Sequence, residues 1–279
     1  METCVFSKHF QSMDADQLGR TLKDFGVDGV DLTTRRGGHV EPERVKGDLP
    51  AFQQALAAHD IKVSMLTTSV TGADEPHATD VIETAGQLGI PYIKLGYWRY
   101  REFGTYRQKA AEVEAGLKSL EPVLKQHGVK AGFHTHSGPC MGLNANFVMR
   151  LIEDRDPDTI GLYYDAGHCT VEGAELGWMM GLDLAADRLF MVAVKDLAFF
   201  YMGGPTAPRK GWRLQMVPLD AGLTDWPAFI KCLKAMDFQG PISFHSEYQG
   251  SFSYMDMNEE QVVEQTHKDL AYWRSLWNH

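Results

Sequence analysis

Imidazole and carboxylate side chains stand at the ends of three short apolar runs in this sequence. Along the chain they are His134 and His136, Asp165 and His168, and His245 and Glu247. Side chains two positions apart on a strand share a face, so the first and last pairs would each point one way. Mixed imidazole and carboxylate ligands suit Mn²⁺, Zn²⁺, Fe²⁺ or Co²⁺ better than Ca²⁺. Each residue also has a structural explanation, because a strand-end histidine is often only hydrogen-bonded and an aspartate often caps the next helix.

Cationic side chains follow two further apolar runs. Lys195 could act as a base or as an electrostatic clamp, or could pair with Asp196 or another carboxylate. Near a bound cation and apolar walls its charged form would be disfavoured, so we expect a lowered pKa. Arg35 and His39 flank a Gly-Gly pair and could grip a polyol or a carboxylate, or lie in a solvated loop.

The elements that position these residues alternate regularly along the chain. Short runs rich in β-branched and aromatic residues indicate eight strands, at residues 4–6, 29–32, 61–66, 92–95, 130–134, 160–164, 189–194 and 242–245. Amphipathic stretches between them indicate helices, for example at residues 15–25, 49–59, 80–88, 106–127 and 226–236. Several of these stretches end in glycine, which is typical of a helix C-cap.

Eight such units predict an α/β fold, a (β/α)₈ TIM barrel, with the chemistry at the carboxyl ends of its strands. The alternative is a doubly wound open sheet. If that sheet bound a dinucleotide it would need a glycine-rich turn after its first strand, but Ser7-Lys8-His9 follows instead. No Gly/Ser-rich or Pro-rich linker divides the chain, so we expect one TIM-barrel domain over residues 1–279.

Composition excludes several classes of function. The 279 residues include 27 Lys and Arg against 37 Asp and Glu, a net charge of −10, which argues against nucleic-acid binding. No apolar run approaches the roughly 20 residues that span a bilayer, and the N-terminal residues do not resemble a signal peptide. The four cysteines are far apart and include no CxxC pair, so we expect a reduced, cytoplasmic protein.

Several motifs, in this order, resemble the sugar phosphate isomerase/epimerase superfamily, the xylose isomerase-like barrels that include inosose dehydratases, ketose 3-epimerases and 3-keto-glycoside lyases. The resemblance covers nearly the whole chain. The motifs are Gly29-Val30-Asp31-Leu32-Thr33, Gly37-Gly38-His39-Val40, Leu88-Gly89-Ile90, His136-Ser137-Gly138, Tyr164-Asp165-Ala166-Gly167-His168, Val194-Lys195-Asp196, Val217-Pro218-Leu219, Asp225-Trp226, and Gly240-Pro241-Ile242-Ser243 through His245 to Glu247-Tyr248.

The resemblance implies a divalent metal held by Glu, Asp, His and Glu from strands five to eight. Asp165 matches the family's aspartate, and His168 matches a histidine that contacts substrate in the ketose epimerases. The chain departs from the pattern elsewhere, with His134 and His245 at the two glutamate positions and Ala193 at the histidine position. We therefore expect one Mn, Co, Zn or Fe ion on His134, Asp165 and His245, with His136 as the competitor of His134.

The expected reaction is proton abstraction beside a carbonyl of a small carbohydrate, followed by β-elimination, as in a 3-keto-glycoside lyase or dehydratase. Disruption of the paired glutamates favours this over the alternative, a sugar isomerase or epimerase. A catalytically silent sugar-binding barrel is the second alternative. Lys195, Glu247 and His168 are the expected catalytic residues, with Glu247 acting as an acid or orienting Lys195. Arg35, His39 and His136 are expected to bind substrate.

The aromatic and Met-rich stretch at residues 199–202 follows a strand end. It could be a substrate lid, a contact in a homo-oligomer, or part of the core. The sequence does not separate these readings.

Overall fold

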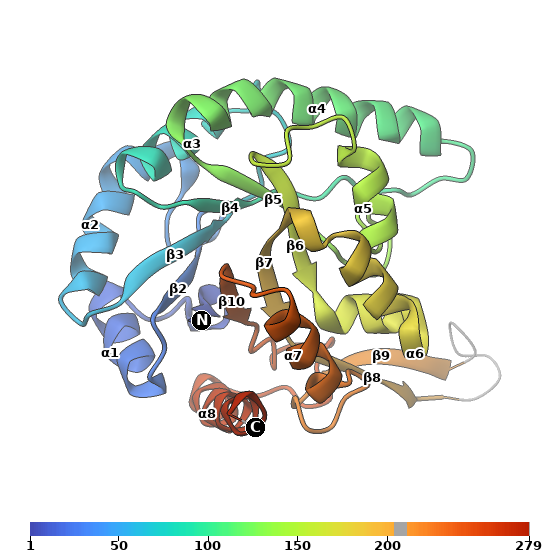
Figure 1. The fold of residues 1–279 in the computed structure, drawn as a ribbon. Helices are drawn as coiled ribbons and strands as arrows, with labels where there is room; N and C mark the ends of the chain where they lie inside the picture. Colours follow the sequence, from blue (N-terminus) through green and yellow to red (C-terminus); the bar gives the residue numbers. More distant parts are fainter. Residues whose placement is uncertain (204–210, 279) are drawn as a thin grey trace.

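Eight parallel strands close into a barrel in this computed structural model, which describes residues 1–203 and 211–278 (Figure 1). Neighbouring strands run in the order β1-β10-β7-β6-β5-β4-β3-β2 around the barrel. The strands are β1 (Glu2–Phe6), β2 (Gly29–Thr33), β3 (Lys62–Thr67), β4 (Tyr92–Lys94), β5 (Lys130–His134), β6 (Ile160–Asp165), β7 (Leu189–Val194) and β10 (Pro241–Phe244). All eight strands expected from the sequence are present, and the TIM-barrel prediction is confirmed.

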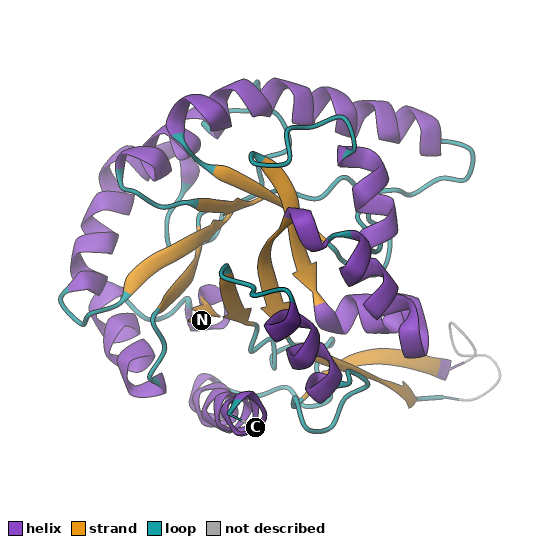
Figure 2. Cartoon of the chain, in the orientation of Figure 1, coloured by secondary structure: helices purple, strands orange, loops and turns teal. Residues whose placement is uncertain are grey.

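Helices surround the barrel as its outer layer (Figure 2). They are α1 (Ala15–Phe25), α2 (Val45–Ala57), α3 (Ala78–Gln87), α4 (Tyr106–His127), α5 (Ala145–Ile152), α6 (Ala166–Leu184), α7 (Trp226–Ala235) and α8 (Glu259–Trp277). Three short 3-10 helices, Ser7–Phe10, Pro42–Arg44 and Ala186–Arg188, join them. Each helix predicted from the sequence is found, although α2 begins four residues earlier than its apolar pattern suggests.

Local chemistry fixes where these helices begin and end. Asp14 caps α1 in a capping box, because its side chain accepts from the backbone of Gln17 while the Gln17 side chain accepts from the backbone of Asp14. The helix ends at Gly26, whose φ of 65° is the left-handed conformation that glycine adopts without steric cost. The next strand can therefore begin within a few residues of the helix end.

The barrel interior contains a buried carboxylate together with several hydroxyl groups. Asp31 of β2 is fully buried and accepts hydrogen bonds from Thr67 Oγ1 at 2.6 Å, Tyr163 Oη at 3.0 Å and Ser243 Oγ at 3.0 Å. Buried carboxylates are tolerated when they are hydrogen-bonded in this way. These bonds join strands on opposite sides of the barrel and fix the ring of Tyr163 beneath the mouth.

An antiparallel hairpin after β7 was not expected from the sequence. It consists of β8 (Asp196–Tyr201) and β9 (Trp212–Val217), and it lies beside α6 (Figure 1). The stretch at residues 199–202 belongs to it and is not core, because Phe199, Tyr201 and Met202 are 50%, 58% and 60% exposed. In the pairing of the two strands, apolar pairs such as Phe199 with Leu214 alternate with pairs that include Gln215 and Arg213.

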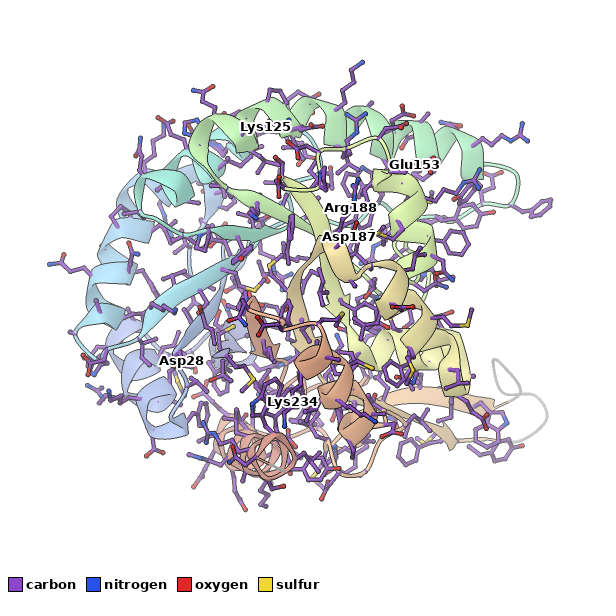
Figure 3. All side chains as sticks on the ribbon, viewed as in Figure 1. Asp28, Lys125, Glu153, Asp187, Arg188 and Lys234 are labelled. Carbon is purple, nitrogen blue, oxygen red and sulfur yellow. The ribbon has the colours of Figure 1, made fainter. Side chains whose placement is uncertain are left out.

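Polar contacts tie the outer layer together at the other end of the barrel. Asp28, which follows α1, accepts from the backbone N–H of Thr3 at 2.7 Å, and Lys125 at the end of α4 pairs with Asp156 at 2.7 Å (Figure 3). All four cysteines lie in the described ranges, and none forms a disulfide. No helix in those ranges is long and apolar enough to cross a membrane.

Candidate active site

A cavity of about 1210 Å³ lies at the carboxyl ends of the barrel strands. Chemistry in TIM barrels takes place at this end. Seven of the nine side chains that the sequence predicts for the site line the cavity, namely Arg35, His134, His136, His168, Lys195, His245 and Glu247. Asp165 lies directly behind Lys195, whereas His39 lies apart from the others.

Lys195 lies between two carboxylates. Its Nζ atom is 3.0 Å from Asp165 Oδ2 and 3.1 Å from Glu247 Oε2, and its side chain is only 3% exposed. Burial on its own would lower the pKa of this ammonium, but the two carboxylates raise it above its ordinary value. The expected lowering of the Lys195 pKa is therefore wrong, because the nearest charges are anions. Lys195 is a fixed cation and is unsuited to be the base.

The two carboxylates are held ionised by the same contacts. Burial would raise the pKa of Asp165 and of Glu247, but Lys195 holds both well below their usual range. Glu247 Oε1 also accepts from Lys8 Nζ at 2.5 Å. An ionised Glu247 has no proton to donate, so of its two expected roles the geometry fits the orientation of Lys195.

Asp165 also begins a helix. It ends β6 and caps α6, and its Oδ1 accepts from the backbone N–H of His168 at 2.9 Å. The capping function and the site function, which the sequence presents as alternatives, therefore use different oxygens of one carboxylate. Capping fixes the direction in which Oδ2 faces Lys195.

His134 and His245 are both hydrogen-bonded within the protein. His134 Nε2 lies 3.2 Å from Asp165 Oδ2, and its Nδ1 lies 2.7 Å from Tyr97 Oη. Burial lowers the pKa of His134 well below its ordinary value. His245 Nε2 lies 2.7 Å from Tyr163 Oη, while its Nδ1 has no hydrogen-bond partner among the described residues.

His136 and His168 form a pair of uncharged rings on one wall of the cavity. Their centroids are 3.9 Å apart. His136 Nδ1 donates to the carbonyl of Ser137 at 2.7 Å, and His168 Nδ1 lies 2.7 Å from Ser137 Oγ. Burial lowers the pKa of His136 to about 4 and that of His168 well below its ordinary value. The carbonyl of Ser137 fixes the His136 proton on Nδ1, so His136 Nε2 is an acceptor, and His168 Nε2 has no hydrogen-bond partner among the described residues.

These donors do not fit a divalent ion in the expected way. In residues 1–203 and 211–278, no three His, Cys, Asp or Glu side chains are arranged to hold a metal. The ring nitrogens of His134 and His245 that face inward are committed to Asp165 and to Tyr163. The space between Asp165 and Glu247 is taken by the Lys195 ammonium. No step of the reaction is therefore assigned to a metal.

The two expected substrate contacts from the loop after β2 have different surroundings. Arg35 lines the cavity, and its guanidinium carbon lies 5.7 Å from the ring centroid of Phe6. His39 lies outside the cavity lining. Its Nδ1 is 3.0 Å from Thr33 Oγ1 and its Nε2 is 3.0 Å from the carbonyl of Phe10, so both ring nitrogens hold the loop in place.

Several cavity residues were missed by sequence reasoning. Lys94 ends β4, is 2% exposed and places its Nζ 3.6 Å from the ring centroid of Tyr97. Burial holds the pKa of Lys94 well below its ordinary value. Its place as the last residue of a barrel strand was a usable signal, because the same rule identified the ends of β5 and β6. Trp212 of the hairpin also lines the cavity, and nothing in its local sequence indicates this. Phe199 lines it too, and it belongs to the stretch at residues 199–202 for which a substrate lid was one of the expected alternatives.

Comparison with known proteins places this barrel among enzymes of one superfamily. An inosose dehydratase of Mesomycoplasma hyopneumoniae (strain 7448) is 22% identical over 237 residues, 81% of this chain and 67% of that protein. The structure of 3-keto-D-glucoside 4-epimerase, YcjR, from E. coli superposes with a TM-score of 0.72 at 16% identity, covering 99% of each chain. The structure of an IolI protein with a bound zinc atom superposes with a TM-score of 0.74 at 17% identity, also covering 99% of each.

The sequence profile described as "Xylose isomerase-like TIM barrel" matches residues 20–275, from the middle of α1 almost to the end of α8. This match spans seven of the eight barrel strands and every residue assigned to the cavity wall except those of β1 and the turn after it. The resemblance seen in the sequence motifs is thus confirmed, and the chain belongs to the xylose isomerase-like TIM barrel family.

Proposed function

We propose that this protein is a carbohydrate-modifying enzyme that removes a proton beside a carbonyl of a keto-sugar and then eliminates a β-substituent. A 3-keto-glycoside or an inosose is the class of substrate. The observation that carries the proposal is the Lys195 ammonium, fixed at 3.0 Å and 3.1 Å from two ionised carboxylates at the cavity wall, beside two uncharged imidazoles. A preorganised cation is what an enediolate oxygen requires.

Each step can be assigned to a residue of the chain. In this proposal His168 carries its proton on Nδ1, which donates to Ser137 Oγ 2.7 Å away, and its Nε2 accepts the proton from the carbon next to the carbonyl. The carbonyl oxygen gains the negative charge and is stabilised by Lys195, which stays protonated. The bond to the β-oxygen then breaks, the electron pair of the enediolate forms the new C=C bond, and the leaving oxygen takes the proton from the His168 imidazolium. The products are an unsaturated ketone and water or an alcohol.

Substrate hydroxyls have donors and acceptors on the remaining walls. His136 Nε2 is an acceptor and Arg35 is a donor, which supports their expected roles in substrate binding. The relatives support the substrate class, since one acts on an inosose and a structural neighbour on a 3-keto-D-glucoside.

Isomerisation or epimerisation is the alternative outcome of the same intermediate. The 4-epimerase fold neighbour supports it. Two-sided proton transfer needs an acid or base on each face of the substrate, and here Asp165 and Glu247 are both paired with Lys195. Elimination needs one imidazole, so the geometry favours it.

Incubation in D₂O with inososes, 3-keto-glycosides and ketoses, followed by NMR, tests the proposal. We expect an unsaturated ketone from one of the first two classes, with loss of the α-hydrogen. Recovered substrate with deuterium and inverted configuration would establish the epimerase instead. Binding without exchange for every substrate would establish a silent sugar-binding barrel and refute both enzymes.

A further inference from the structure

The centre of this site holds a cation that belongs to the chain itself. Asp165 is fully buried, the Glu247 side chain is 20% exposed, and Lys195 is 3% exposed between them. Two carboxylates in such surroundings require a positive charge within contact distance. Lys195, which directly follows β7, supplies this charge. The β7 residue that pairs with Asp165 in the sheet is Ala193, which is small.

Two imidazole nitrogens lie near these carboxylates and have no hydrogen-bond partner among the described residues. Among the described residues, His168 Nε2 and His245 Nδ1 are buried and make no hydrogen bond. His168 Nε2 lies 4.0 Å from Asp165 Oδ2, and His245 Nδ1 lies 3.9 Å from Glu247 Oε2. We call these two atoms the open nitrogens. Buried polar atoms are nearly always paired, so their state requires an explanation.

We propose that Lys195 is a built-in replacement for a divalent ion, and that its removal uncovers a latent metal site made of Asp165, Glu247 and the open nitrogens. Two carboxylate oxygens and two imidazole nitrogens form a donor set that suits Zn²⁺, Co²⁺ or Mn²⁺. In the native protein the ammonium lies between the two carboxylates, and in the described ranges no three such side chains are arranged to hold a metal. A bound ion would give the open nitrogens the partner that they lack among the described residues.

This arrangement differs from the metal site expected from the sequence. The ligands expected from the sequence were His134, Asp165 and His245. In the structure, Nε2 of His134 is hydrogen-bonded to Asp165, and Nε2 of His245 is hydrogen-bonded to Tyr163. The latent site uses the other nitrogen of His245 and exchanges His134 for His168 and Glu247. The inference concerns the protein without substrate and does not depend on the proposed reaction.

Metal content and thermal unfolding test it without any activity assay. The wild-type protein and the Lys195→Ala variant are dialysed against Zn²⁺, Co²⁺ or Mn²⁺, washed, and analysed for metal. We expect the variant to retain about one ion per chain, with the visible absorption of Co²⁺ in an oxygen and nitrogen site and a higher melting temperature when metal is present. The wild-type protein should retain no stoichiometric metal, and a chelator should leave its melting temperature unchanged.

Two control variants make the result specific. Lys94→Ala removes the other buried lysine that lines the cavity, whose Nζ lies over the Tyr97 ring, and it should gain no metal. Asp165→Asn combined with Lys195→Ala removes one proposed ligand, and it should abolish the gain. Metal uptake by Lys94→Ala equal to that of Lys195→Ala would overturn the assignment of the ligands.

Other outcomes also decide the matter. One tightly held ion in the wild-type protein, with a melting temperature that falls in a chelator, would overturn the proposal. So would a folded Lys195→Ala variant that binds none of the three ions. If Lys195→Ala folds only with metal, the proposal is supported. If it fails to fold under every condition, Lys195→Met is used, and failure of both variants with metal present refutes the idea that an ion can replace the ammonium.

Discussion

The substitution Lys195→Met should destabilise the protein more than any exposed lysine change. It keeps most of the side-chain length and removes the charge between Asp165 and Glu247. Glu247 retains Lys8 at 2.5 Å, but Asp165 retains only hydrogen bonds from His134 and the His168 backbone. Asp165, a carboxylate with no exposed surface, is therefore the group that is left without a cationic partner.

The expected size follows from the burial of this pair. Removing one partner of a buried ion pair lowers the free energy of unfolding by about 3–5 kcal/mol. At about 2–4 °C per kcal/mol for domains of 150–250 residues, the melting temperature should fall by on the order of 10 °C. The same substitution at Lys268, which pairs with Glu264 on the exposed face of α8 at 2.7 Å, should cost less than about 1 kcal/mol and is the matched control.

The pH dependence gives a second, independent signature. In the wild-type protein Asp165 has a pKa below its unfolded value of about 3.9, so its stabilising contribution is present above that pH and is lost as the pH falls through the folded pKa. Lys195 has a raised pKa, so its contribution is present below about pH 10.4 and is lost as the pH rises through the folded pKa. Between about pH 5 and 9 these contributions should be constant.

In Lys195→Met, burial without the ammonium should raise the Asp165 pKa, because desolvation disfavours the charged form. The variant should therefore recover stability relative to wild type as the pH falls from 7 to 5. Urea unfolding at several pH values measures both effects, and adding Asp165→Asn to the variant should restore part of the loss. The reasoning would be refuted if the free energy of unfolding of Lys195→Met were less than about 1 kcal/mol below that of the wild type at pH 7, or if this difference grew towards pH 5.

Three further predictions follow from the site and its surroundings. His168→Gln should lower kcat by about 100-fold or more, the scale of general acid–base catalysis, and should abolish exchange of the substrate α-hydrogen with D₂O while leaving the melting temperature nearly unchanged. Arg35→Met should raise KM with little loss of stability. His39→Ala should lower the melting temperature and leave KM unchanged, because both ring nitrogens of His39 hold the loop in place. Steady-state kinetics and thermal unfolding measure the two effects, and the opposite result for each variant would exchange their roles. Asp196→Asn should cost about 1–3 kcal/mol in urea unfolding, since an amide nitrogen cannot accept from the Thr224 or Trp226 donors that the carboxylate satisfies; an unchanged midpoint would show that these bonds contribute little.

The barrel could be predicted from the sequence because its determinants are local. Each strand is a short apolar run, and each helix is an amphipathic stretch with its own cap, such as Asp14 and Gly26 on α1. The closed order of strands follows from repetition of one right-handed unit. The hairpin of β8 and β9 escaped prediction because several of its aromatic residues, Phe199, Tyr201 and Trp212 among them, are exposed, and apolar patterning indicates burial rather than exposure.

The residues of the site were also largely readable, since a barrel brings every strand end to one mouth. Seven of the nine expected side chains line the cavity for this reason. His39 was the exception within a loop, because the direction of a loop side chain depends on partners such as Thr33 and Phe10 that are fixed only by folding.

The sequence by itself determined which charged and imidazole groups meet; only the tertiary structure decided what they do to one another. Lys195 illustrates the difference. Its type and its place at a strand end were visible in the chain, but the sign of its pKa shift depends on which charges lie within a few ångströms. Asp165 ends β6 and Glu247 lies in the loop after β10, and they approach Lys195 to 3.0 Å and 3.1 Å. Electrostatic energy varies with distance and burial, and neither quantity is local in sequence.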